Sequence, residues 1–115
     1  LVLEGVAQIL KDLVVNDNLV GRYGGEEFVA LLPGANEAQA EAMAESVRSA
    51  VENYVFTTDQ GQEVRATISV GIAVFPGDAR EVSGLIKKAD RAAYLAKRMG
   101  KNQVCLYEDR TGVAA

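Results

Sequence analysis

The sequence contains no histidine and only one cysteine in 115 residues. Histidine is the commonest general base and the commonest transition-metal ligand, so any chemistry must rely on carboxylates and lysines. Carboxylate oxygens make hard cations such as Mg²⁺ the natural metal. The single cysteine, Cys105, cannot form an intrachain disulfide and is typical of a reducing compartment, so we expect a cytoplasmic location.

The sequence also lacks a long apolar run and an excess of basic residues. No stretch approaches the roughly 20 apolar residues that span a bilayer, and the first residues lack the pattern of a signal peptide. The 12 basic and 16 acidic residues give a net charge of −4, which argues against a dedicated binder of long nucleic acids. We therefore expect no nucleic-acid polymer as partner and no membrane contact within this chain.

The composition, 49% apolar and 24% charged, is typical of one small globular domain. We place that domain at residues 1–108 and a frayed tail at residues 109–115. The chain opens in helical phase, without an initiator methionine. We expect it to be an excerpt of a longer protein.

The spacing of apolar residues predicts a mixed α/β fold, with a mainly antiparallel sheet flanked by helices. Gly24-Gly25 predicts a two-residue type I′ turn between the first two strands. Capping-box patterns begin at Asn36 and Asp78, each with its polar partner three residues later. The expected elements are a helix ending near Asn16, strands Val20–Tyr23 and Glu26–Leu32, a helix Glu37–Asn53, strands Val55–Thr58 and Val64–Phe75, a helix between Glu81 and Gly100, and a strand Gln103–Tyr107.

Three ordered blocks carry a resemblance to a known family. They are "RYGGEEF" at Arg22–Phe28, "TISVGIAVFP" at Thr67–Pro76 and "ADRAAYLAKRMGKNQV" at Ala89–Val104. The sequence resembles the GGDEF family of diguanylate cyclases, in the variant with glutamate at the third position of the signature. This resemblance implies a nucleotide-cyclase palm-like fold.

The resemblance also implies an activity and partners. Two GTP are condensed into cyclic di-GMP and pyrophosphate in bacterial second-messenger signalling, with Mg²⁺, or Mn²⁺ in its place. Each site holds one GTP, so a homodimer is needed, and an upstream sensory or regulatory domain is expected.

The resemblance gives the acids of the signature specific roles. Glu26 becomes the catalytic residue and first metal ligand, and Glu27 the second candidate ligand. Gly24 and Gly25 become substrate-binding, because no Cβ blocks a nucleotide from the turn backbone. Strand alternation alone directs the two acids to opposite faces, where they could simply be solvated.

Two lysines near the end of the last predicted helix can be interpreted either as helix-stabilising cations or as phosphate ligands. Cations are favoured at a helix C-terminus by about 0.3 to 1 kcal/mol without any ligand. The family motif implies that Lys97 and Lys101 contact the triphosphate. Lysine replaces the family's arginine at position 101, which loses the bidentate fork and predicts a weaker contact. We expect Asn102 to order the turn and Arg48 to be a solvated side chain.

Two departures from the family pattern weigh on the function. Val15 and Asn18 stand at the positions of an Arg-x-x-Asp inhibitory site, so product binding there is expected to be lost or weakened. The family's first strand, with its metal-binding aspartate, has no counterpart before Leu1, so we expect a fold lacking that strand and no catalysis by these 115 residues alone. The alternatives are a degenerate regulatory or nucleotide-binding module and a purely structural role for the acids and lysines.

Overall fold

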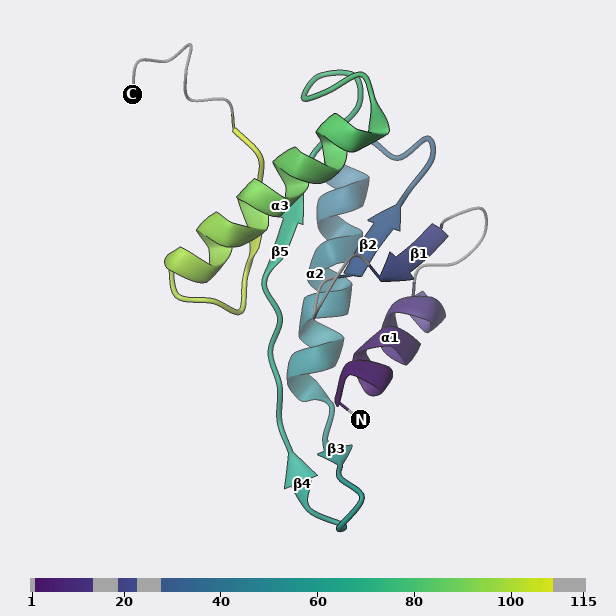
Figure 1. Ribbon diagram of the computed structural model, residues 1–115, viewed down its shortest axis with the longest axis vertical. Coiled ribbons are helices and arrows are strands. Elements are labelled where there is room, and N and C mark those ends of the chain that lie inside the picture. Colours follow the sequence, from purple (N-terminus) through teal and green to yellow (C-terminus); the bar gives the residue numbers. More distant parts are fainter. Residues whose placement is uncertain (1, 14–18, 23–27, 109–115) are drawn as a thin grey trace. The chain divides into compact units, whose positions relative to one another are not determined.

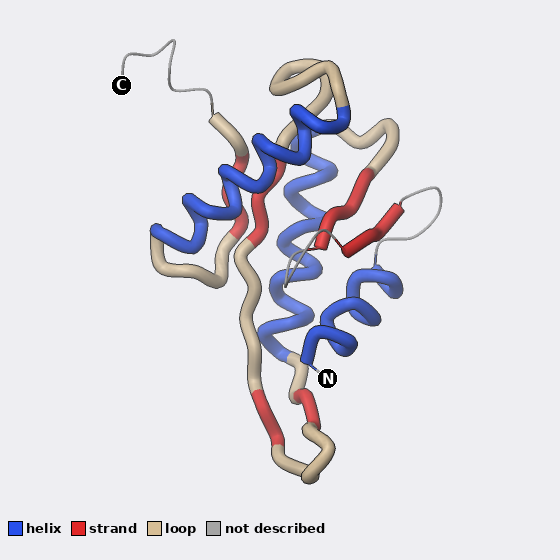
Figure 2. Tube along the Cα trace, viewed as in Figure 1, coloured by secondary structure: helices blue, strands red, loops and turns tan. Residues whose placement is uncertain are grey.

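The computed structural model describes residues 2–13, 19–22 and 28–108, which fall into two compact units divided after Ile68 (Figures 1 and 2). None of the described helices combines the length and the apolar character needed to cross a membrane. The first unit contains α1 (Val2–Leu13), β1 (Leu19–Arg22), β2 (Phe28–Leu31), α2 (Glu37–Asn53), β3 (Phe56–Thr57) and β4 (Glu63–Val64). The second contains β5 (Val70–Ile72), α3 (Val82–Arg98) and β6 (Val104–Leu106).

The core of the first unit forms where α1, α2 and β3 meet. Val6, Val47, Val51 and Phe56 are buried together there. The backbone of α1 lies directly against the ring of Phe56, since a Cβ on Gly5 would stand 2.5 Å from the ring atom Cε1. Apolar side chains from several elements therefore converge on the ring of Phe56.

The beginning of α2 is fixed by the capping box expected from the sequence. The Gln39 amide donates to Asn36 Oδ1 at 2.8 Å, and the Asn36 amide donates to Gln39 Oε1 at 2.9 Å. These bonds satisfy two amides that a helix start otherwise leaves unpaired. The predicted bounds of this helix are confirmed.

The β1–β2 hairpin is antiparallel, as predicted. Its described register runs from Leu19 opposite Leu31 to Arg22 opposite Phe28. The turn predicted at Gly24-Gly25 falls in residues 23–27, which lie outside the described residues, so it stays a prediction. Phe28 packs against the core, and burial of one face of a strand strongly specifies its register.

The long strand predicted at Val64–Phe75 is wrong, because within it only Val64, at the end of β4, and β5 are strand. β4 pairs antiparallel with β3, and β5 pairs parallel with β6. Among the described residues, the intervening segment 65–69 has no strand beside it. An extended segment joins a sheet only where a neighbour accepts and donates its hydrogen bonds. Two of the three described strand pairs are antiparallel, so the mixed, mainly antiparallel class is confirmed.

The second unit depends on a close approach of α3 to β5 (Figure 1). A Cβ on Gly71 would stand 2.0 Å from the carbonyl oxygen of Ala89 and 2.2 Å from the amide of Ala93. Ala92 and Ala96 are fully buried. Glycine in the "TISVGIAVFP" block therefore lets a helix backbone lie on a strand backbone.

The start of α3 differs from the predicted capping box. The N-cap is Glu81, and its side chain makes no capping hydrogen bond. Asp78 instead belongs to the preceding turn, where its Oδ2 accepts from the Val74 amide at 2.7 Å. The carboxylate is thus already engaged before the helix begins, so the predicted Asp78–Glu81 box is wrong.

Candidate functional site

The predicted metal ligands and the two signature glycines fall outside the described part of the chain. Gly24, Gly25, Glu26 and Glu27 lie in segment 23–27, and the inhibitory-site positions lie in segment 14–18. In the ranges that the structure does describe, no three Asp, Glu or Cys side chains gather closely enough to hold a metal ion. The roles predicted for these residues therefore remain predictions.

The two predicted phosphate-binding lysines are both described, at the C-terminal end of α3. Lys97 lies in the last turn of the helix, Lys101 follows it, and both are exposed. Among the described residues, neither ammonium group takes part in an ion pair. Both cations are therefore accessible to an anion.

The turn that carries Lys101 has an uncommon backbone. Gly100, Lys101 and Asn102 have φ angles of 121°, 64° and 50°. Glycine at the position after the C-cap was predicted and is confirmed. Asn102 was predicted to order this turn, and its left-handed φ agrees. Lysine is much rarer in that conformation, and nothing in the sequence indicated it.

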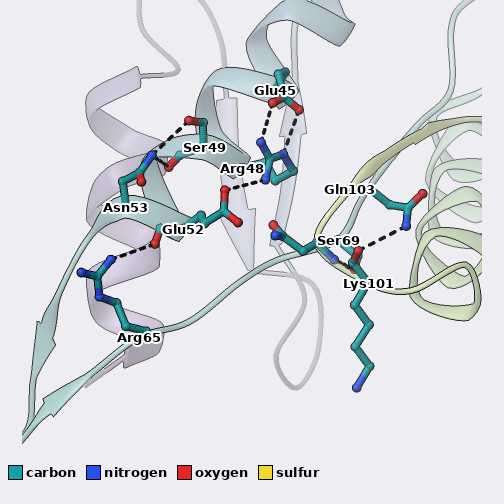
Figure 3. Close-up of polar contacts among 10 residues, drawn as sticks. Glu45, Arg48, Ser49, Glu52, Asn53, Arg65, Ser69, Lys101 and Gln103 are labelled. Carbon is teal, nitrogen blue, oxygen red and sulfur yellow. Dashed lines mark hydrogen bonds and ion pairs between the residues drawn. The ribbon is translucent and has the colours of Figure 1, made fainter.

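A network of hydrogen bonds holds this turn (Figure 3). The side-chain amide of Gln103 donates to the carbonyl oxygens of Met99, at 3.1 Å, and Lys101, at 3.2 Å. The Asn102 amide donates to Ser69 Oγ at 3.2 Å. Sequence reasoning missed both side chains: Ser69 stands in a family block but had no assigned role, and Gln103 was taken as the start of a strand.

A second charged cluster lies on α2 and is satisfied within the helix (Figure 3). Arg48 contacts both carboxylate oxygens of Glu45, at 2.8 and 2.6 Å, and Glu52 Oε1 at 3.1 Å. Its side chain is 15% exposed, so the prediction of a solvated arginine is wrong. The reason is that acids three residues before it and four after it lie on the same helix face.

The hydrogen bond from Arg48 holds the pKa of Glu45 below its usual value, and the two acids raise the pKa of Arg48. The Arg48 guanidinium is thus engaged by two acids of its own helix. Arg98, next to Lys97, likewise contacts Tyr94, donating to its hydroxyl at 3.2 Å. Lys97 and Lys101 remain the site candidates at this end of α3.

Comparison with known proteins decides the family. The family model described as "Diguanylate cyclase, GGDEF domain" matches residues 1–103. The chain belongs to the GGDEF domain family. Diguanylate cyclase A of Treponema denticola is 37% identical over 106 residues, which cover 92% of this chain and 28% of that protein.

Solved GGDEF domains share the fold. The GGDEF domain of TpbB, also called YfiN, from Pseudomonas aeruginosa matches with a TM-score of 0.88 and 30% identity, covering 98% of this chain and 66% of that one. The active GGEEF domain of a diguanylate cyclase from Vibrio cholerae matches with a TM-score of 0.76 and 27% identity, covering 94% and 67%. The expected family and fold are thereby confirmed.

The match to the GGDEF family covers part of longer proteins. The chain spans less than a third of the length of the curated relatives it matches. Family membership therefore supports cyclic di-GMP synthesis in general, whereas the activity, substrates and partners of a whole protein are matters for a proposal.

Proposed function

We propose that this GGDEF chain is part of a diguanylate cyclase, which condenses two GTP into cyclic di-GMP and pyrophosphate in bacterial second-messenger signalling. The observation that carries the proposal is the family match over residues 1–103, in which the signature Gly24–Phe28 reads "GGEEF". A solved GGEEF domain of this family is described as active, so glutamate at the third position is compatible with turnover in that protein.

The proposed roles follow from what phosphoryl transfer requires. The reaction depends mainly on neutralised charge and on in-line placement of the attacking and leaving oxygens. Glu26 acts on the attacking hydroxyl, and Glu26 and Glu27 offer the carboxylate oxygens that Mg²⁺ or Mn²⁺ prefers. When bound, the metal supplies charge neutralisation. Gly24 and Gly25 let the nucleotide approach the backbone.

Lys97 and Lys101 bind the triphosphate in this proposal. Their exposure and their lack of ion pairs among the described residues support it. Lysine contacts a phosphate as a point charge, whereas arginine offers a bidentate fork, so affinity below that of an arginine variant is expected at position 101. Substitution of Lys101 by arginine should therefore tighten nucleotide binding.

Two such domains must meet for turnover, because each contributes one GTP. A homodimer in the cytoplasm, under control of an upstream sensory or regulatory domain, fits this chemistry. Product feedback through positions 15 and 18 is absent in the proposal, because Val15 offers no charge for a phosphate. Calorimetric titration with cyclic di-GMP should show no tight binding that depends on Val15 and Asn18.

One observation favours a second function, that of a degenerate regulatory or nucleotide-binding module. Both Val15 and Lys101 replace an arginine of the family pattern. Such a module would bind GTP without turnover.

The deciding experiment is GTP turnover with Mg²⁺ by the longest native chain that carries these 115 residues, with chromatography for cyclic di-GMP. Product that disappears in Glu26→Ala, but persists in the matched control Glu41→Ala on an exposed face of α2, supports the cyclase. GTP binding without product from a folded protein supports the degenerate module. A cyclase unaffected by Glu26→Ala contradicts the proposed role of that residue.

A further inference from the structure

The conformation of Lys101 requires a physical explanation. Its φ of 64° lies in the left-handed region, where the Cβ of an L-residue is crowded. Such outliers persist where the surrounding structure imposes them, and they cluster at binding sites. Lys101 is exposed, so burial of its side chain does not impose this conformation.

Hydrogen bonds from both directions impose it instead. The Lys101 amide donates back to the carbonyl of Ala96 at 3.0 Å, which ties the residue to the last turn of α3. The Lys101 carbonyl accepts from the side chain of Gln103, and the Gln103 carbonyl accepts from the Val70 amide of β5 at 2.9 Å. The backbone of Lys101 is thereby tied to a helix on one side and to a strand on the other.

The Gln103 side chain also alters the electrostatics at the C-terminal end of α3. The last carbonyls of a helix carry partial negative charge, which disfavours a nearby anion. Gln103 directs its donor to the carbonyl of Met99 and to that of Lys101, the second of which Figure 3 shows. An anion held by Lys101 therefore meets carbonyls that already have a hydrogen-bond donor.

We propose that Gln103 is a positioning residue for nucleotide binding: its side-chain amide holds the left-handed turn that presents Lys101 to the triphosphate of GTP. The proposal rests on the proposed function, in which Lys101 contacts that triphosphate. Ser69 supports the same turn through the amide of Asn102. Gln103 acts through Lys101 and makes no contact with the nucleotide itself.

A double-mutant cycle tests this role, since coupling between two residues appears as non-additivity. The variants are Lys101→Ala, Gln103→Met and the double variant, in the longest native chain, with Gln60→Met as the matched control in an exposed turn. Gln103→Met keeps the length of the side chain and removes the donor. The readouts are the dissociation constant of GTP with Mg²⁺ by calorimetry and, where turnover occurs, KM and kcat.

We expect Gln103→Met to weaken GTP binding by about three- to tenfold, the effect of freeing one ordered, rotamer-rich side chain. The KM should rise by the same factor, with kcat within about twofold of the unsubstituted protein. In the Lys101→Ala background the same substitution should have no further effect. Gln60→Met should leave every value unchanged.

The outcomes separate the two proposals. If Lys101→Ala weakens binding and Gln103→Met does not, the positioning role is wrong and the proposed function stands. Equal losses from Gln103→Met in both backgrounds show a general structural role and also overturn the inference. If Lys101→Ala leaves GTP affinity unchanged, the phosphate contact itself is wrong, and the positioning role is overturned with it.

Discussion

The internal packing of the first compact unit differs from that of the second. In residues 1–68, large side chains converge, and Phe56 is 4% exposed among Val6, Val47 and Val51. In residues 69–108, the missing side chain of Gly71 and the small side chains of α3 let two backbones meet. The first unit should therefore be sensitive to removal of volume at Phe56, and the second to addition of volume at Gly71.

The largest expected effect is in the first unit. Phe56→Ala should lower the free energy of unfolding by about 3 to 5 kcal/mol, because it leaves a cavity in the core. Urea unfolding followed by circular dichroism measures this. Phe75→Ala is the matched control, since Phe75 is 60% exposed and its truncation should change little. Equal losses at both positions would contradict the assigned core.

The reverse change should damage the second unit. Gly71→Ala adds a single methyl group, which would clash with backbone atoms of α3. Backbone atoms cannot relieve a clash by changing rotamer, so the free energy of unfolding should fall by about 1 to 3 kcal/mol or more. Gly77→Ala adds the same group where no atom lies within 4 Å. Thermal unfolding of the pair should show a lowered midpoint for Gly71→Ala alone. A Gly71→Ala protein of unchanged stability would refute the close packing.

A smaller effect is expected at the start of α2. Asn36→Ala removes one half of the capping box and should cost about 1 kcal/mol. Asn36→Asp keeps an acceptor for the Gln39 amide and should retain most of the stability. Urea unfolding of both variants distinguishes loss of the cap from a general sensitivity of the position to substitution.

The smallest effect is a pH dependence from the Glu45–Arg48 pair. The pKa of Glu45 is lowered in the folded state, chiefly by the hydrogen bond from Arg48. Its contribution to stability is therefore fully present above the ordinary value of 4.5 and is lost as the pH falls through the folded pKa. The Glu45 side chain is exposed, so solvent screens the pair and the contribution is small.

A comparison of unfolding free energies for the unsubstituted protein and Glu45→Gln checks this sign. The difference between the two should be greatest at neutral pH and should shrink under acid. A difference that grows as the pH falls would show that the pair does not act as assigned.

One local signal in the sequence predicted its element well, another local signal failed, and the extent of the strands was not predicted. The bounds and cap of α2 were predicted because Asn36 and Gln39 lie within one turn of each other. The strand predicted at Val64–Phe75 was wrong because apolar alternation does not show whether a neighbour is present. Asp78 was misassigned because Val74, before it in the chain, engages its carboxylate.

The candidate site shows the same limit. Family blocks identified Lys97 and Lys101, and the structure places both at the end of α3. The role of Gln103 could not be predicted, because its amide reaches the carbonyl of Met99 only across a left-handed turn. A glutamine carries no signal for such a turn, and a lysine in it is contrary to ordinary preference.

The parallel pairing of β5 and β6 has a consequence for folding order. Two parallel strands cannot be joined by a tight turn, and here the connection between β5 and β6 contains the whole of α3. The ends of this long connection must come together before the Val70 amide can donate to Gln103 and the Tyr107 amide to Ile72. Loop-closure entropy opposes that step until the helix packs. The turn with Lys101 lies at the point of closure, so Lys101 should acquire its conformation last. Pulse-labelling hydrogen exchange should accordingly show these two amides protected together, after those of α2.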